Sequence, residues 1–327
     1  MPATNKPRVA KVLSNAPPAY AVIDLGTNSC RLLIARYIND EINIIDSFSD
    51  SISLGKGINK TQEINEQAKQ RAINCLIKIK NKIAKHNIVS ISAVATETCR
   101  RAKNGKAIID EIYQKTGIKF KIIDTKEESE LAVAGCYDLC NGKTNLVFDI
   151  GGGSTQIMLV KNNDIIDYIS IPYGVLTLTE KINKTYVNEQ EFVKYQEYIK
   201  SYLNKLPYEN ISDINVVGTS GTITTIASTH LKLNTYKRNL IDGIKIEQSE
   251  IMSLAKKIAK MQEKERVKIP SINQKYSKLM MAGCIILYSI CEKFEAKYIN
   301  VADRGIREGM LKRLIKKLVA YKQDLLI

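Results

Sequence analysis

The pattern of apolar and polar residues divides the chain into two halves that begin in the same way. Near the start, an apolar run ends in Asp24, a turn of small residues follows, and the chain is apolar again over 32–35. In the middle, an apolar run ends in Asp149, a glycine-rich turn follows, and residues 157–160 are apolar. Each half is therefore predicted to open with a strand, a tight turn and a second strand.

Extended and helical patterns alternate along the rest of each half. Thr61 is predicted to cap the first helix, which has acidic residues in its first turn. Alternation of strands and helices of these lengths predicts an α/β fold with a mixed sheet in each half. The predicted strands and helices cover 20–54 (β block), 61–85 (helix), 89–95 (strand), 105–116 (helix), 120–123 (strand), 126–139 (helix), 145–171 (strands), 177–206 (helices), 214–217 (strand), and 223–231, 248–263, 275–294 and 307–319 (helices).

The duplication suggests where the chain divides into domains. Gly142 marks the predicted boundary, because it follows a helical pattern and precedes the second apolar strand. We expect a loose leader over 1–19, a first domain over 20–141 and a second domain over 142–310. The C-terminal helix, 311–327, is expected to pack back onto the first domain.

The two turns have the composition of phosphate-binding turns. Glycine allows backbone N–H groups to approach an anion, hydroxyl groups add donors, and an aspartate can hold a metal ion beside the phosphate. A tight hairpin would explain either turn alone, but the repetition with an aspartate in both favours a cleft for a phosphate chain. The candidate phosphate-binding residues are Thr27, Asn28 and Ser29 in the first turn and Gly151, Gly152, Gly153 and Ser154 in the second.

Composition sets limits on partners and location. The formal charge is +15, from 49 Lys and Arg against 34 Asp and Glu, so polyanions are attracted over long range. Seven cysteines form no CxxC pair, and no signal peptide precedes them, which favours reduced thiols in a cytoplasmic protein. No apolar run approaches the roughly 20 residues that span a bilayer, so no membrane partner is expected.

Further motifs resemble a known family. With the two turns, the segments 95–102, 122–131, 218–222 and 303–309 resemble the exopolyphosphatase/guanosine pentaphosphate phosphatase (Ppx/GppA) family, in a short two-domain form. The resemblance implies two duplicated actin-like (ribonuclease H-like) domains with mixed sheets around a central cleft. It also implies removal of a terminal phosphate from inorganic polyphosphate or guanosine pentaphosphate with Mg²⁺, or with Mn²⁺ in its place.

The resemblance assigns roles to individual residues. Glu128 matches the family's catalytic glutamate and would deprotonate water, while Arg100 would hold phosphate oxygens with its planar fork. Asp149 is assigned to catalysis and, with Asp24, to the metal ion. The remaining candidate phosphate-binding residues are Gly218, Ser220, Gly221, Thr222 and Arg307.

One residue departs from the family pattern. Members of the family usually have a glutamate after the GGGST run, and this chain has Gln156. Glutamine keeps the shape of glutamate, but it can neither take a proton nor offer negative charge to Mg²⁺. Activity would then be reduced, or carried by Glu128 and the aspartates.

Several functions remain open at the level of sequence. The first is hydrolysis of polyphosphate, which the positive charge favours, and the second is hydrolysis of guanosine pentaphosphate. A catalytically weak sensor that binds polyphosphate or an alarmone is the third, with Gln156 as its signature. The actin-like fold also hosts kinases and ATPases, although the phosphatase motifs argue against these. No nucleic-acid motif accompanies the charge, so nucleic acid is not expected as a partner, while a homodimer is left open.

Overall fold

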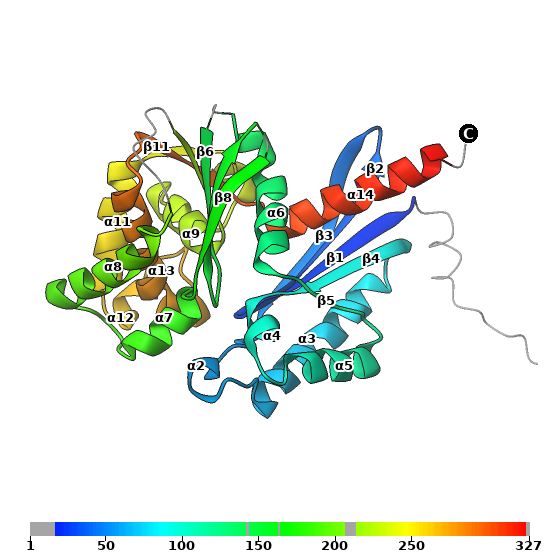
Figure 1. Cartoon of the computed structure of the whole chain (residues 1–327), viewed down its shortest axis with the longest axis horizontal. Coiled ribbons are helices and arrows are strands. Elements are labelled where there is room, and N and C mark those ends of the chain that lie inside the picture. The colour runs from blue at the N-terminus through cyan, green and yellow to red at the C-terminus, as the bar shows by residue number, and fades with distance from the viewer. Residues whose placement is uncertain (1–16, 142–143, 163, 207–213, 325–327) are drawn as a thin grey trace, which may run out of the picture.

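The computed structural model describes residues 17–141, 144–162, 164–206 and 214–324. Two mixed β-sheets, each with helices packed on its faces, lie side by side (Figure 1). This confirms the α/β class that the alternation of strands and helices predicted. Most of the leader predicted over 1–19 lies outside the described residues, and the first strand begins at Ala19.

The first sheet is built from residues of the N-terminal half, with the strand order β3-β2-β1-β4-β5. Strand β1 runs antiparallel to β2 and parallel to β4, which makes the sheet mixed. The elements of this half are β1 (Ala19–Leu25), β2 (Ser29–Ile38), β3 (Glu41–Ser51), α2 (Ile58–Thr61), α3 (Glu66–Ile83), β4 (Ile88–Ala95), α4 (Glu97–Arg101), α5 (Gly105–Thr116), β5 (Lys121–Ile122), α6 (Thr125–Cys136) and the 3₁₀-helix η1 (Tyr137–Leu139).

The second sheet repeats this arrangement with one strand more. Its order is β10-β11-β9-β6-β7-β8, and β6 runs antiparallel to β7 and parallel to β9, as β1 does to β2 and β4. The elements are β6 (Thr144–Ile150), β7 (Thr155–Lys161), β8 (Asp164–Ile171), α7 (Val175–Ile182), α8 (Glu189–Leu203), β9 (Asn215–Thr219), α9 (Gly221–His230), α10 (Arg238–Ile241), β10 (Lys245–Glu247), α11 (Gln248–Lys260), α12 (Glu263–Arg266), α13 (Gln274–Lys293), β11 (Tyr298–Ala302) and α14 (Ile306–Asp324).

Each sheet has one face covered by helices of its own half of the chain and one face covered by a helix from the other half. Helices α3 and α5 pack on one face of the first sheet, and α7, α8, α11 and α13 contribute to the large core on one face of the second. On the remaining faces, α14 packs its Met310, Leu311 and Ile315 against β1 and β2, and α6 packs Ala132 and Val133 against β6 and β7. The two helices therefore cross between the sheets (Figure 1).

Glycines set the separation of α6 and α14 at this crossing. A methyl group on Gly135 of α6 would overlap the carbonyl oxygen of Gly305, and one on Gly309 of α14 would overlap that of Leu131. The backbones are thus in direct contact, which only residues without a Cβ allow. The expected boundary at Gly142 lies just after η1, but residues 142–143 are outside the described ranges.

Two expectations about local structure differ from the observed fold. The N-cap predicted at Thr61 is wrong, because Thr61 ends the short helix α2, and α3 begins at Glu66 after Asn65. The Asn65 side chain accepts a hydrogen bond from the N–H of Ala68 at 2.9 Å, as a capping residue does. Strands β10 and β11 were not predicted, and they extend the second sheet beyond β9.

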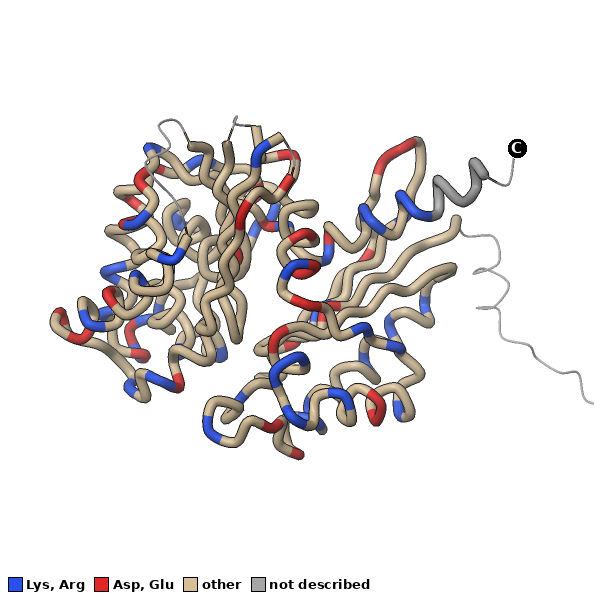
Figure 2. The backbone as a smooth tube through the Cα atoms, viewed as in Figure 1, with Lys and Arg blue, Asp and Glu red and all other residues tan. Residues whose placement is uncertain are grey.

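Charge is distributed over the whole molecule. Figure 2 shows Lys and Arg along the helices of both halves, with Asp and Glu interspersed among them. None of the helices in the described ranges is both long and apolar enough to cross a bilayer. The excess of Lys and Arg is spread along the elements of both halves and is not gathered in one element.

Candidate active site

The two predicted turns are closed by the same backbone hydrogen bond. The N–H of Gly26 donates to the carbonyl of Ser29 at 3.0 Å, and the N–H of Gly151 donates to that of Ser154 at 3.0 Å. These bonds set the register, so that Asp24 lies opposite Arg31 and Asp149 lies opposite Gln156. Residues directly opposite in an antiparallel pair point to the same face of the sheet. Arg31 and Gln156 therefore occupy equivalent places in the two repeats.

The turns meet where the two domains touch. A Cβ on Gly152 would lie 2.8 Å from the backbone nitrogen of Asn28, and one on Gly153 would overlap the carboxylate of Glu97. Glycine at both positions lets the second turn approach the first, which a larger residue would prevent. The structure thus brings the predicted turns together at one site.

Three buried carboxylates gather beside these turns. Burial raises the pKa of Asp24 to about 6 and that of Glu128 to about 7, and it also raises the pKa of Asp149. The charges of Asp149 and Asp24 raise the pKa of Glu128 further, which places all three groups within electrostatic reach of one another. Perturbed carboxylates clustered at a domain boundary are typical of a functional site.

Helix α6 presents Glu128 from its first turn. Asp124 caps the helix by accepting from the N–H of Glu127 at 2.8 Å, and Glu128 is only 6% exposed. Arg100 forms an ion pair with Glu128 at 3.0 Å and donates to the carbonyl of Ile123 at 2.7 Å. The guanidinium therefore orients the carboxylate that the family resemblance assigned to the base.

The neighbouring charged residues point away from Glu128. Glu127 pairs with Lys121 at 2.6 Å and with Arg313 at 3.0 Å, toward the outside of the helix. Arg101 pairs with Glu97 at 2.9 Å and donates to the side chain of Asn59. Of the adjacent residues Glu127 and Glu128, and of Arg100 and Arg101, it is thus Glu128 and Arg100 that contact one another.

The first-turn side chains are bonded within the protein. Thr27 donates to Glu97 at 3.2 Å, and Thr98 donates to Thr27 at 2.8 Å. The Asn28 side-chain oxygen accepts from the hydroxyl of Ser53 at 3.3 Å, and its amide lies 3.4 Å from the hydroxyl of Ser29. These bonds hold the turn in shape, and backbone N–H groups are the donors best placed to meet an anion there.

The turn between β9 and α9 contributes four predicted residues with different surroundings. Gly218 lies inside β9 against the ring of Phe148, so the structure accounts for this glycine by packing. Ser220 has a positive φ of 83° and donates its hydroxyl to Asp149. Gly221 and Thr222 begin α9, where free backbone N–H groups favour an anion.

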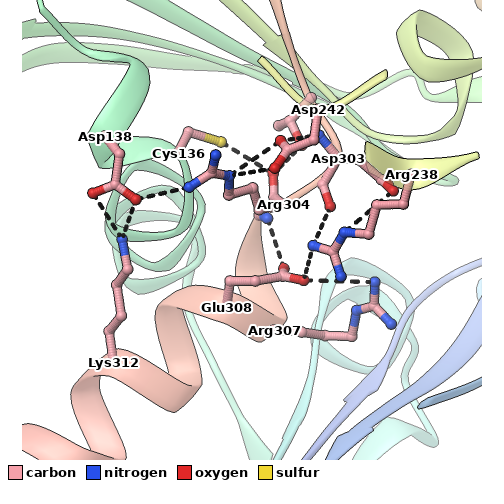
Figure 3. Close-up of polar contacts among 11 residues, drawn as sticks. Cys136, Asp138, Arg238, Asp242, Asp303, Arg304, Arg307, Glu308 and Lys312 are labelled. Carbon is pink, nitrogen blue, oxygen red and sulfur yellow. Dashed lines mark hydrogen bonds and ion pairs between the residues drawn. The ribbon is translucent and has the colours of Figure 1, made fainter. Parts of the chain in front are cut away.

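Two arginines lie close to Asp24. Arg307, on the first turn of α14, is partly buried (Figure 3). Loss of solvent around its guanidinium lowers its pKa, and the charges of Arg31 and Asp24 also act on it. Arg31 was not among the predicted site residues. Because the bond between Gly26 and Ser29 places position 31 opposite position 24, the hairpin register could have identified it.

Two other residues near the turns were also missed. Glu97 lies between the two turns, with its carboxylate held by Thr27 and Arg101. Tyr276, at the start of α13, has its hydroxyl 3.4 Å from that of Thr222 and close to Gly221. Glu97 lies within the motif at 95–102, but its place between the turns depends on tertiary packing, and no local pattern in the sequence indicates Tyr276.

The donor set can be compared with the needs of a metal ion. One oxygen of Asp24, Oδ1, is buried with no hydrogen-bond partner, so it is available as a ligand. Within the described part of the chain, no group of three or more His, Cys, Asp and Glu side chains is placed to hold a metal ion. Mg²⁺ commonly uses one or two carboxylates, with waters and phosphate oxygens completing the shell, and Asp24 with Asp149 fits that pattern.

Gln156 belongs to the same site. It is 2% exposed, lies opposite Asp149 and donates from Nε2 to the hydroxyl of Ser154 at 2.8 Å. The side chain is thus turned toward the second turn on the face that carries Asp149. The departure from the family pattern thus falls beside Asp149.

The two mixed sheets with their paired aspartate turns define an actin-like fold. Comparison with known sequences identifies the family. The model of the Ppx/GppA phosphatase family matches residues 33–318, so the chain belongs to that family, as the motifs predicted.

Three relatives illustrate the likeness. A bifunctional 3-dehydroquinate synthase/phosphatase of Fusobacterium nucleatum is 31% identical over 305 residues, which cover 89% of this chain and 46% of the relative. The chain thus spans about half the length of that protein. A Haemophilus influenzae protein named as an exopolyphosphatase is 25% identical over 302 residues, which cover 90% of this chain and 91% of the relative. The crystal structure of the Aquifex aeolicus family member superposes with a TM-score of 0.77 and 28% identity, covering 91% of this chain and 98% of the other.

The raised pKa of Glu128 leads to a prediction about stability. Its carboxyl titrates near 4.5 when unfolded and near 7 when folded, so the folded state holds a proton that the unfolded state has released between these values. The contribution of this group is present below pH 4.5 and lost as pH rises through about 7. Relative to Glu128→Gln, the wild-type free energy of unfolding should fall by about 1–3 kcal/mol from acid to neutral pH, measured by urea denaturation. A difference independent of pH would contradict the burial of an ionisable Glu128.

Proposed function

We propose that the chain is a phosphohydrolase that releases terminal orthophosphate from inorganic polyphosphate. The observation that carries this proposal is Glu128, a buried carboxylate held by Arg100 and facing Asp24 and Asp149 at the boundary of two domains. Membership of the Ppx/GppA phosphatase family supports it, as does the Haemophilus relative with its exopolyphosphatase name. The substrate and the metal ion are part of the proposal.

The residues of the site supply the parts that phosphoanhydride hydrolysis requires. Glu128 accepts a proton from water as the water oxygen bonds to the terminal phosphorus, and the bond from phosphorus to the bridging oxygen breaks. A pKa of about 7 suits a base that works near neutral pH. Arg307, Arg31 and the N–H groups of the turns bind the phosphate oxygens, and the shortened chain leaves with the bridging oxygen.

Asp24 and Asp149 are proposed to hold Mg²⁺, or Mn²⁺ in its place. When bound there, the ion would neutralise charge on the phosphate oxygens. The unpartnered oxygen of Asp24 supports this assignment, whereas Asp149 already accepts from Ser220 with one oxygen. Asp24 and Asp149 would therefore contribute unequally to binding of the metal ion.

A polymeric substrate fits the charge of the molecule. The excess of 15 positive charges is spread over both halves (Figure 2), so a long polyanion can meet cationic side chains outside the site, whereas a nucleotide reaches only a few. Guanosine pentaphosphate is the second candidate, because a relative from Aliivibrio fischeri is named guanosine-5'-triphosphate,3'-diphosphate pyrophosphatase. Gln156 beside Asp149 favours a third, a binding protein with little activity.

One assay separates these candidates. Phosphate release is measured from long-chain polyphosphate, tripolyphosphate, guanosine pentaphosphate and ATP, with and without Mg²⁺, at several salt concentrations. We expect release from polyphosphate that requires the metal ion and falls with salt more steeply than any nucleotide hydrolysis. Equal salt slopes would argue against polyphosphate as the substrate, and no release from any of the four would favour the binding protein.

The role of Glu128 is tested by replacing its carboxylate. Glu128→Gln should retain substrate binding, with KM within about threefold, and lower kcat by about 10²–10⁴, the usual size of a general-base contribution. Glu130→Gln on the same helix is the control, because Glu130 pairs with Arg313 outside the cleft at 3.0 Å. Wild-type turnover in Glu128→Gln would remove that residue from its proposed role.

The role of Gln156 is tested by restoring the family's glutamate. Gln156→Glu adds negative charge opposite Asp149, so Mg²⁺ should bind about threefold to tenfold more tightly and turnover should rise. Calorimetry with Mg²⁺ and steady-state rates measure the two effects. Gln156→Met, which has similar length and no charge, should show neither gain. Unchanged metal affinity and unchanged rate in Gln156→Glu would show that this position does not act on the site.

A further inference from the structure

The first turn of α14 contains a buried carboxylate with several partners. Glu308 is 8% exposed, and its Oε1 lies 2.9 Å from Nη2 of Arg238 and 4.0 Å from Nη2 of Arg307 (Figure 3). Its other oxygen, Oε2, accepts from the backbone N–H of Gly305 at 2.9 Å. The Oε1 atom thus accepts a hydrogen bond from Arg238 and forms a longer ion pair with Arg307, and the Oε2 atom accepts a hydrogen bond at the start of the helix.

Arg238 is anchored independently of Glu308. Its Nη2 donates to the carbonyl of Asp303 at 2.6 Å, and its Nε lies 3.5 Å from the Asp303 carboxylate. Asp303 is held in turn by its own N–H, which donates to Asp242 at 3.0 Å. Arg238 is therefore fixed on the second domain, and it fixes one side of Glu308.

Arg307 lacks such an anchor. Among the described residues, Glu308 is the one acidic side chain that forms an ion pair with Arg307. Two other positive charges, Arg31 and Arg238, act on Arg307, and Asp24 offsets them only in part. Without a carboxylate beside it, the like charges of Arg31 and Arg238 would favour positions of the flexible Arg307 side chain that lie further from them.

We propose that Glu308 is a positioning residue, which shares its carboxylate between Arg238 and Arg307 and so holds the Arg307 guanidinium beside Asp24, where phosphate binds. The inference rests on the proposed function for the identity of the anion. The arrangement requires a carboxylate, since the Oε1 of a glutamine is neutral and its Nε2 cannot accept from Gly305. Arg307 is thereby oriented before any phosphate arrives, which reduces the entropy lost on binding.

The kinetic test uses Glu308→Gln and measures KM separately from kcat. Loss of the shared charge should raise KM for polyphosphate about tenfold and leave kcat within about threefold, because the water-activating groups are untouched. The matched control is Glu130→Gln. It removes a carboxylate that pairs with Arg313, an arginine of α14 like Arg307, and it should leave both constants unchanged. A lower kcat with unchanged KM would overturn the positioning role.

A second measurement does not depend on activity. In Arg307→Ala, free guanidinium at about 10 mM, too dilute to denature, should enter the vacated place and raise the melting temperature relative to equal NaCl. In the double variant Arg307→Ala, Glu308→Gln, the rise should disappear. An equal rise in both variants, or in neither, would overturn the proposal. If the wild-type protein released no phosphate, the proposed function would fail, and the melting measurement would still decide the role of Glu308.

Discussion

The site depends on the close approach of two turns that both carry a buried aspartate. Gly152 lies against the backbone of Asn28, and Gly153 lies against the Glu97 carboxylate, so the second turn adds no side chain of its own at these two points of contact. This contact brings Asp24 and Asp149 from separate sheets into one electrostatic neighbourhood with Glu128. Burying three carboxylates together is costly, and the arginines and Ser220 offset part of that cost. The proposed divalent cation would complement the carboxylates, and the proposed phosphate chain would complement the arginines.

Much of the fold follows from local patterns. The helix predicted over 105–116 agrees with α5 at both ends, because Gly117 ends it with a positive φ of 74°. The repeated hairpins were predicted because alternation and turn composition are properties of neighbouring residues. Strand β10 has three residues, and its place depends on pairing with β11, which lies about fifty residues further along the chain. The crossing of α6 and α14 was not evident either, since an apolar face shows that a helix packs but does not show which sheet it covers.

The site was predictable to a similar extent. Asp24, Asp149 and Glu128 could be proposed because Asp24 and Asp149 lie near the ends of strands and Glu128 at the start of a helix, each in a recognisable motif. The structure places the three within electrostatic reach of one another. The contact between Arg100 and Glu128 was not predicted, because the two residues belong to different motifs and meet only when β4 and β5 pair. Gly218 shows the opposite case, since a glycine in a promising turn is also explained by the ring of Phe148. Composition alone does not distinguish a glycine that faces a ligand from one that faces a core.

The backbone contact between α6 and α14 has a mechanical consequence. Gly135 and Gly309 leave the two helices no space to move closer, and Arg313 of α14 pairs with Glu127 and Glu130 of α6 at 3.0 Å each. Helix α6 packs on the second sheet and α14 on the first, so the crossing ties the two sheets to each other. Across the domain boundary, Gly57 and Glu180 are joined by a hydrogen bond of 2.8 Å. Any rotation that separates the two halves must therefore break this hydrogen bond as well as the ion pairs of Arg313.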